Sequence, residues 1–153
     1  MISSGVSSRI YYVSMNGFDT HSLQKDLHAQ LMRQFAAAVA AFSRHRERAG
    51  LSDRVVLVAF SEFGRRVREN GSQGTDHGVA GPVWVVSGGV RGGVVGEPPD
   101  LGNLVDGDLP HGIDFRRIYA TLLDEVLGVG AREILGGDFE KLPFLRTRKR
   151  GVF

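Results

Sequence analysis

Residues 22–49 carry a stripe of apolar side chains at intervals of three or four positions in an alanine-rich background. The stripe consists of Leu23, Leu27, Leu31, Phe35, Val39 and Phe42. Because an α-helix has 3.6 residues per turn, this spacing predicts one long amphipathic helix. Gly50 follows it as the expected residue after the C-terminal cap. The fold is constrained most strongly here, since the predicted helix separates two strand-like runs.

Short runs rich in β-branched and aromatic residues lie on both sides of this helix. Residues 9–13 (Arg-Ile-Tyr-Tyr-Val) precede it, and residues 55–60 (Val-Val-Leu-Val-Ala-Phe) follow it. The second run is continuously apolar, which is typical of strands covered on both faces in parallel sheets. The order strand, helix, strand predicts a right-handed βαβ unit, with a third strand over residues 83–86. We therefore expect an α/β fold with a mostly parallel sheet.

The remaining segments fit one domain over residues 1–153. A polar, glycine-punctuated loop is expected between the strands, over residues 61–82. A second helix is predicted from Phe115 to Leu127, with Asp114 as its N-terminal cap and Gly128 at its C-terminal end. Residues 146–153 form a basic tail.

Composition excludes several classes of protein. The 153 residues are 42% hydrophobic and 24% charged, and the net charge of +2 gives no continuous basic face, so no nucleic-acid partner is expected. Cysteine is absent, which excludes disulfides, thiolate metal sites and cysteine nucleophiles. No apolar run approaches the roughly 18 residues that span a bilayer, so no membrane span is expected. The first nine residues lack the layout of a signal peptide, so no export signal is expected within the chain.

Two glycine-flanked segments each combine a carboxylate with an imidazole. Residues 17–21 read Gly-Phe-Asp-Thr-His, and residues 74–78 read Gly-Thr-Asp-His-Gly. Ligands bind outside the carboxyl ends of strands in open parallel sheets, and both segments are expected at that rim. Carboxylate and imidazole ligands favour zinc or a similar divalent ion. The candidate metal ligands are Asp19, His21, Asp76 and His77; the alternative is that they are ordinary turn residues.

Three other residues could take part. Arg65 offers the bidentate fork that phosphate and sulfate groups prefer, and is the candidate anion-binding residue. Glu62 is either a metal ligand or a partner for Arg65 or Arg66, and we favour the ion pair. His111 is either a further ligand or a turn residue at the helix entry, and we favour the turn.

The order of the motifs resembles one bacterial family. The motifs are Gly-Phe-Asp-Thr-His-Ser-Leu-Gln at 17–24, Glu-Phe-Gly-Arg at 62–65, Glu-Asn-Gly at 69–71, Gly-Thr-Asp-His-Gly at 74–78 and Ile-Leu-Gly-Gly-Asp-Phe at 134–139. They resemble the C-terminal part of the domain-of-unknown-function fifteen-oh-one proteins, which are sulfatase-like members of the alkaline phosphatase superfamily. The likeness runs nearly from end to end.

The resemblance implies a partial alkaline-phosphatase-like α/β/α sandwich and a divalent-metal site for hydrolysis of phosphate or sulfate esters. It matches Asp76 and His77 to the superfamily's adjacent Asp-His ligands, and Asp19 and His21 to its other pair. It also implies export by the twin-arginine route and an exported or periplasmic location.

Family members are similar in being longer, with an N-terminal half that supplies the nucleophile. Nothing before Asp19 resembles that half. We therefore expect a C-terminal fragment that is inactive alone and that either self-associates through the open strand at residues 9–13 or pairs with the missing half. The alternative is a non-catalytic metal-binding or structural module.

Overall fold

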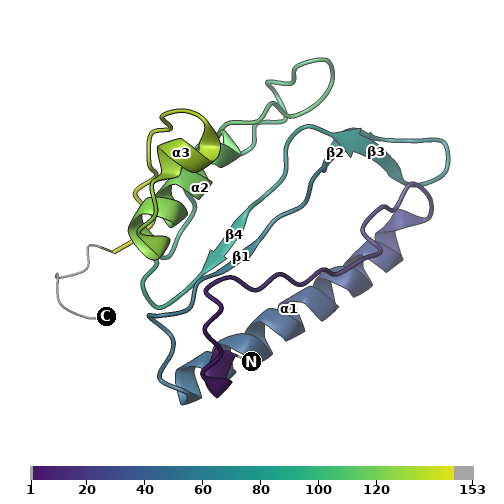
Figure 1. Cartoon of the computed structure of the whole chain (residues 1–153). Helices are drawn as coiled ribbons and strands as arrows, with labels where there is room; N and C mark the ends of the chain where they lie inside the picture. The colour runs from purple at the N-terminus through teal and green to yellow at the C-terminus, as the bar shows by residue number, and fades with distance from the viewer. Residues whose placement is uncertain (1, 147–153) are drawn as a thin grey trace. The chain divides into compact units, whose positions relative to one another are not determined.

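The computed structural model describes residues 2–146 and has a mixed α/β fold (Figure 1). The elements in chain order are η1 (Ile2–Ser4), α1 (Gln24–Arg48), β1 (Leu57–Ala59), β2 (Gly64–Glu69), β3 (Thr75–Gly78), β4 (Trp84–Val86), α2 (Phe115–Leu122), the π-helical turn η2 (Leu123–Leu127) and α3 (Ala131–Leu135). They fall into two compact units. The described part of the first unit is residues 2–88 and 99–110, and that of the second is residues 89–98 and 111–146.

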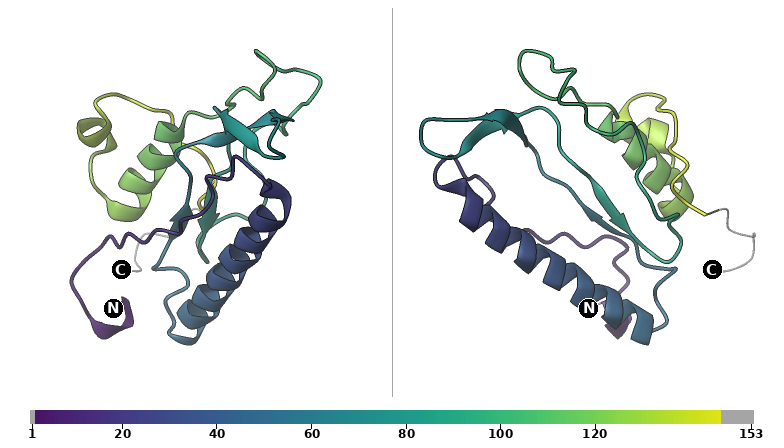
Figure 2. Two further views of the ribbon diagram at one scale, coloured as in Figure 1. Left: turned by 90° about the vertical axis from the view of Figure 1, so that its right-hand side faces the viewer. Right: turned by 180° about the vertical axis from the view of Figure 1, so that it is seen from behind.

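The predicted long helix is confirmed as α1. It ends at Arg48, and Gly50 follows in the left-handed conformation with φ 66°. The extended chain before the helix runs back along it (Figures 1 and 2). Leu31 of the apolar stripe is buried against Gly17, where an added β-carbon would lie 3.3 Å from a Leu31 methyl group. The ring of Phe18 meets His28 edge to face at 5.7 Å. These contacts hold residues 17 and 18 against the helix.

A buried arginine ties the other end of α1 to the strands. Arg46 is only 4% exposed, and its Nη1 donates to the carbonyl oxygens of Val55 at 2.7 Å and Val86 at 3.2 Å. Its Nη2 donates to Ser43 Oγ at 3.3 Å. Because Val55 lies just before β1 and Val86 ends β4, one guanidinium joins the helix to both strands.

The prediction of an α/β/α sandwich with a mostly parallel sheet is wrong. The structure has two separate two-stranded sheets, and both are antiparallel. The pair β1–β4 places Leu57 opposite Val86, and the pair β2–β3 places Arg65 opposite His77. The chain runs in one direction through β1 and β2, turns after residue 69, and runs in the opposite direction through β3 and β4 (Figure 2). Both pairs are therefore antiparallel.

The predicted βαβ unit is absent because residues 9–13 do not form its first strand. They lie outside the paired strands, with Ile10 69% and Tyr12 81% exposed. β-branched and aromatic residues favour an extended backbone but specify neither the partner strand nor its direction. The predicted strands at 55–60 and 83–86 exist in shorter form as β1 and β4, whereas the predicted loop at 61–82 contains β2 and β3.

The second unit contains α2, η2 and α3. The Asp114 carboxylate accepts a hydrogen bond from the backbone N–H of Arg116 at 2.9 Å, which confirms the predicted cap, and Gly128 closes η2 with φ 62°. The Arg116 guanidinium, hydrogen-bonded to Asp114, lowers the pKa of that carboxyl to about 2. The core of this unit consists of Ala120, Thr121, Ala131, Leu142 and Phe144.

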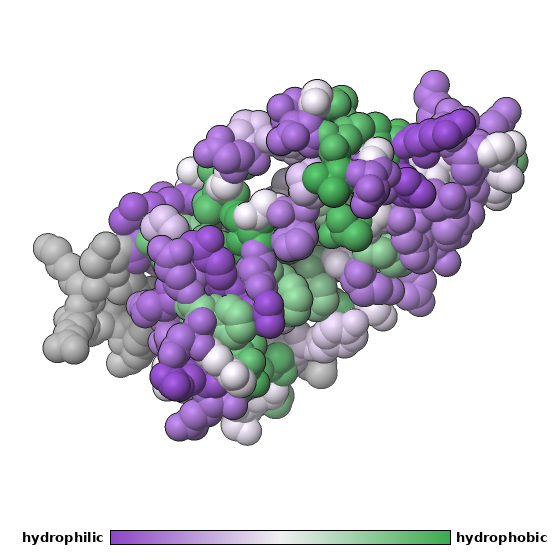
Figure 3. All heavy atoms as spheres, turned by 90° about the horizontal axis from the view of Figure 1, so that it is seen from above, coloured by the Kyte–Doolittle hydropathy of each residue, from purple (hydrophilic) through white to green (hydrophobic). Residues whose placement is uncertain are grey.

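Many apolar side chains reach the surface, as the face in Figure 3 illustrates. Among residues 2–146, no helix is both long and apolar enough to cross a membrane. This agrees with the absence of a membrane span predicted from the sequence. The predicted basic tail at 146–153 lies outside the described residues, except for Arg146.

Replacing Leu31 with alanine tests the packing that holds the N-terminal segment against α1. We expect Leu31→Ala to lower the free energy of unfolding by about 2–5 kcal/mol, because it leaves a cavity beneath Gly17. Leu27→Ala is the matched control on the same helix, where the side chain is 45% exposed, and should cost less than about 1 kcal/mol. Urea unfolding followed by circular dichroism measures both. Equal losses would contradict this account of the packing.

Candidate metal centre

Three side chains from two segments converge in the first unit. Asp19 and His21 come from the extended chain before α1, and His77 comes from β3. Asp19 Oδ1 lies 2.7 Å from His77 Nε2 and 2.9 Å from His21 Nε2. The two Nε2 atoms lie 3.2 Å apart. One carboxylate oxygen and two imidazole nitrogens thus form a small triangle.

Either a proton or a cation is required at each close contact among these three atoms. A carboxylate oxygen and an unprotonated imidazole nitrogen both present lone pairs, which repel each other unless a proton or a metal ion lies between them. In tetrahedral zinc sites, bonds of about 2.0–2.1 Å hold ligand atoms about 3.3 Å apart. The observed separations of 2.7, 2.9 and 3.2 Å are slightly smaller, and the side chains are 46–65% exposed, so a small outward movement would admit an ion.

Asp76 lies on the other side of the His21 ring. Its Oδ1 is 3.3 Å from His21 Nδ1, and it accepts a hydrogen bond from Asn70 Nδ2 at 3.2 Å. The hydrogen bond from Asn70, followed by that from His21, lowers the pKa of Asp76. A carboxylate on Nδ1 keeps the proton there and leaves the Nε2 lone pair directed at the triangle. Of the four predicted ligands, the structure therefore brings three together and places the fourth, Asp76, behind His21.

Arg65 connects the extended chain before α1 to the start of β3. Its Nη1 donates to the carbonyl oxygen of Thr75 at 2.6 Å, and its Nη2 donates to that of Phe18 at 2.5 Å. The same Nη2 lies 3.7 Å from Asp19 Oδ1. The pKa of Asp19 is lowered, first by the hydrogen bond from His77 and to a smaller extent by the positive charge of Arg65. The predicted anion-binding guanidinium thus contacts backbone carbonyls beside the cluster.

Two further side chains support the cluster. The ring of Phe63 stacks on the ring of His77, with centroids 3.9 Å apart and planes 5° apart. Asn70 donates through Nδ2 to the carbonyl oxygen of His21 at 3.0 Å and accepts at its Oδ1 from the backbone N–H of Gly74 at 3.1 Å. It therefore joins the turn after β2 to the loop that carries His21.

Sequence reasoning assigned no role to Asn70 or Phe63. An Asn-Gly pair between extended segments is a strong hairpin signal, and reading Asn70-Gly71 in that way would have predicted the turn between β2 and β3. No comparable signal exists for Phe63, because ring stacking depends on residues 14 positions apart.

The two remaining candidates lie outside the cluster. The side chain of Glu62 forms no ion pair or hydrogen bond within the described part of the chain, so the favoured pairing with Arg65 or Arg66 is wrong. His111 belongs to the second unit and directly precedes the turn into α2, close to the capping residue Asp114 in the chain.

The site therefore belongs to the class of exposed clusters with two histidines and one carboxylate, with a second carboxylate behind one imidazole.

The family model for "Protein of unknown function (DUF1501)" matches residues 2–136. The chain belongs to this family, which confirms the family that the motifs resemble. Comparisons with curated proteins and with solved structures found no match.

Gly74 provides a test of how the β2–β3 turn positions His21. A β-carbon at Gly74 would lie 2.3 Å from the carbonyl carbon and oxygen of His21, so the two segments must separate. We expect Gly74→Ala to shift the imidazole resonances of both clustered histidines in NMR spectra. Gly71→Ala in the same turn is the matched control, since its β-carbon would meet nothing within 4 Å. Unchanged resonances in Gly74→Ala would show that the close approach does not position His21.

Proposed function

We propose that this chain carries a divalent-metal site formed by Asp19, His21 and His77. The observation that supports it is the triangle of three possible ligand atoms, 2.7–3.2 Å apart, at one exposed place. The donor set of two imidazoles and one carboxylate suits zinc, which takes three protein ligands at sites with an open position. Asp76 acts on His21 Nδ1, where a carboxylate orients the ligand and increases its basicity.

The proposed reaction is hydrolysis of phosphate or sulfate esters within a longer, sulfatase-like protein. A divalent ion at this place supplies polarisation of a phosphoryl or sulfuryl oxygen and activation of a nucleophile. The exposure of all three ligands leaves room for a substrate. Kinship with the sulfatase-like enzymes, and the exported location that goes with it, rests on the order of the five sequence motifs.

Two hydroxyl groups near the ligands, those of Thr20 and Thr75, are hydrogen-bonded to Gln24. Thr20 is 4% exposed, and its Oγ1 accepts from Gln24 Nε2 at 2.9 Å. Thr75 Oγ1 donates to Gln24 Oε1 at 3.0 Å. Both hydroxyls contact an amide side chain and not a general base. The nucleophile of the proposed reaction is therefore assigned to the N-terminal half that the family resemblance implies, and the alternative is a metal-binding module without catalysis.

Zinc titration tests the ligand set. We expect one zinc ion per chain, with affinity lowered by at least about 100-fold in His77→Ala, because a ligand is lost. Asp76→Asn should cost about 10–100-fold, the range typical of groups that orient a ligand. Isothermal titration calorimetry measures all three proteins.

His111→Ala is the matched control for these variants and should bind zinc as the natural sequence does. Metal content after dialysis, measured by elemental analysis, provides an independent readout. Equal zinc content in the natural chain and in His77→Ala would refute the proposed site.

Hydrolysis assays separate the two candidate functions. We expect the chain alone to give no turnover of aryl phosphates or aryl sulfates, with or without zinc, because the resemblance assigns the nucleophile to the N-terminal half of longer family members. Turnover that disappears in His77→Ala would show that the chain contains a complete active site. Turnover only after addition of the N-terminal half of a longer family member would favour the hydrolase over the non-catalytic module.

A further inference from the structure

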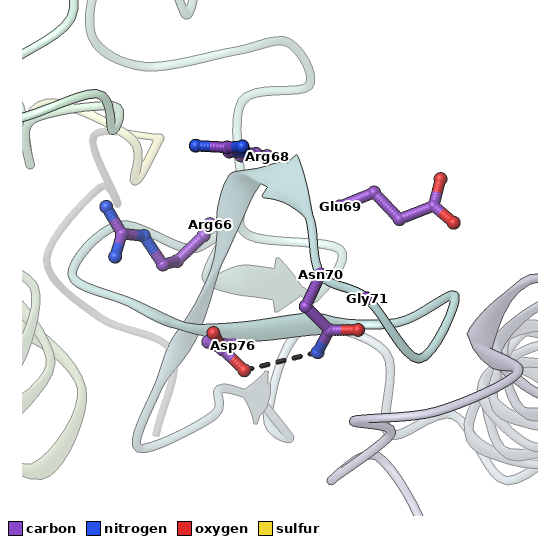
Figure 4. A pocket seen from close by; sticks show the side chains of 6 residues that line it. All are labelled: Arg66, Arg68, Glu69, Asn70, Gly71 and Asp76. Atoms are coloured by element: carbon purple, nitrogen blue, oxygen red, sulfur yellow. Dashed lines mark hydrogen bonds between the residues drawn. The ribbon is translucent and has the colours of Figure 1, made fainter.

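A polar cleft of about 330 Å³ lies beside the metal cluster in the first unit (Figure 4). Its walls come from β2, the turn after it and β3. The lining residues are Arg66, Arg68, Glu69, Asn70, Gly71 and Asp76. Two guanidinium groups, those of Arg66 and Arg68, thus line the cleft.

The β2–β3 ladder is irregular between Arg65 and Glu69, so the spacing of residues does not fix which face each side chain leaves. Figure 4 shows the guanidinium groups of Arg66 and Arg68 on the same side of β2, with the Glu69 carboxylate pointing away from both. The cleft therefore presents two positive charges together on one side.

The two arginines differ in how they are held. Arg66 Nε lies 2.9 Å from Asp108 Oδ2, and its Nη2 donates to the carbonyl oxygen of Asp106 at 3.3 Å. These contacts orient the guanidinium and do not use Nη1. Arg68 is exposed and has no hydrogen bond or ion pair with any other described residue. The oriented guanidinium of Arg66 and the unpaired guanidinium of Arg68 can together donate hydrogen bonds to one anion.

Arg65 is less suited to this role. Its side chain is 17% exposed, and both of its terminal nitrogens donate to backbone carbonyl oxygens. Binding a phosphate or sulfate group there would break the contacts that hold Phe18 and Thr75 together. Arg65, the residue predicted from sequence to bind an anion, instead positions two backbone segments.

Asp76 connects the cleft to the metal cluster. It lines the cleft, and its Oδ1 lies 3.3 Å from His21 Nδ1. Without a metal ion, the negative charges of Asp76 and Asp108 oppose an anion in the cleft. A divalent cation next to His21 would offset the negative charge of Asp76 and make the surroundings of the cleft more positive.

We propose that Arg66 and Arg68 bind the tetrahedral phosphate or sulfate group of the ester, and that metal bound at the neighbouring cluster strengthens this binding. The inference rests on the proposed metal site and adds the residues that recognise the substrate's anionic group. By thermodynamic linkage, the anion must strengthen metal binding by the same factor.

Zinc affinity measured in sulfate and in chloride at equal ionic strength tests the proposal. We expect sulfate to strengthen zinc binding at least about fivefold. Arg68→Ala should abolish this gain, measured for each protein as the ratio of its zinc affinities in sulfate and in chloride. Arg33→Ala, which removes an exposed arginine from α1, is the matched control and should retain the gain. Phenylphosphonate in place of sulfate shows whether the cleft also accepts a phosphate-like group.

The outcomes separate this inference from the proposed function. If zinc does not bind in chloride, the proposed metal site fails, and the linkage fails with it. If zinc binds but neither sulfate nor phenylphosphonate strengthens it, the metal site stands and the anion cleft is refuted. A gain that persists in Arg68→Ala also refutes the cleft. As a second readout, the side-chain Nε resonance of Arg68 should shift on addition of sulfate to the zinc-loaded protein.

Discussion

The hydrogen bonds of Arg65 are the interaction on which the site depends. One guanidinium donates to a carbonyl oxygen of the segment before α1 and to another at the start of β3. Asp19 and His21 follow the first carbonyl by one and three positions, and His77 follows the second by two. Because charged donors make strong hydrogen bonds to carbonyl oxygens, this bridge sets the distance between segments that are more than 50 residues apart in the chain.

The bridge has an electrostatic consequence. It brings together atoms that repel each other, namely a carboxylate oxygen and two imidazole nitrogens, at an exposed place in a small unit. Asp76 contacts one of these imidazoles from behind, Asn70 holds the backbone carbonyl of the same histidine, and Phe63 covers the face of the other imidazole. A proton or a cation between the three atoms relieves their repulsion. In the proposed metal site, Asp76 has the role of a group that orients a ligand.

Prediction from sequence succeeded where the physical cause is local. The helix over residues 24–48 follows from its apolar stripe, and the Asp114 cap and the glycines after α1 and η2 follow from backbone chemistry at helix ends. The sheet failed because strand pairing is not local. Residues 55–60 are extended as predicted, but only the turn after β2 decides that β1 pairs with β4 in the antiparallel direction.

The sequence by itself determined the long helix, the membership of the family and the residue types able to bind a divalent ion. Only the tertiary structure decided which of them meet. Asp19, His21 and His77 lie together, whereas Asp76 contacts His21 from the other side of its ring. Arg65 donates hydrogen bonds to the backbone, and the cleft is lined instead by Arg66 and Arg68. The reason is that a motif specifies donor atoms, whereas their separation depends on hydrogen bonds between distant segments.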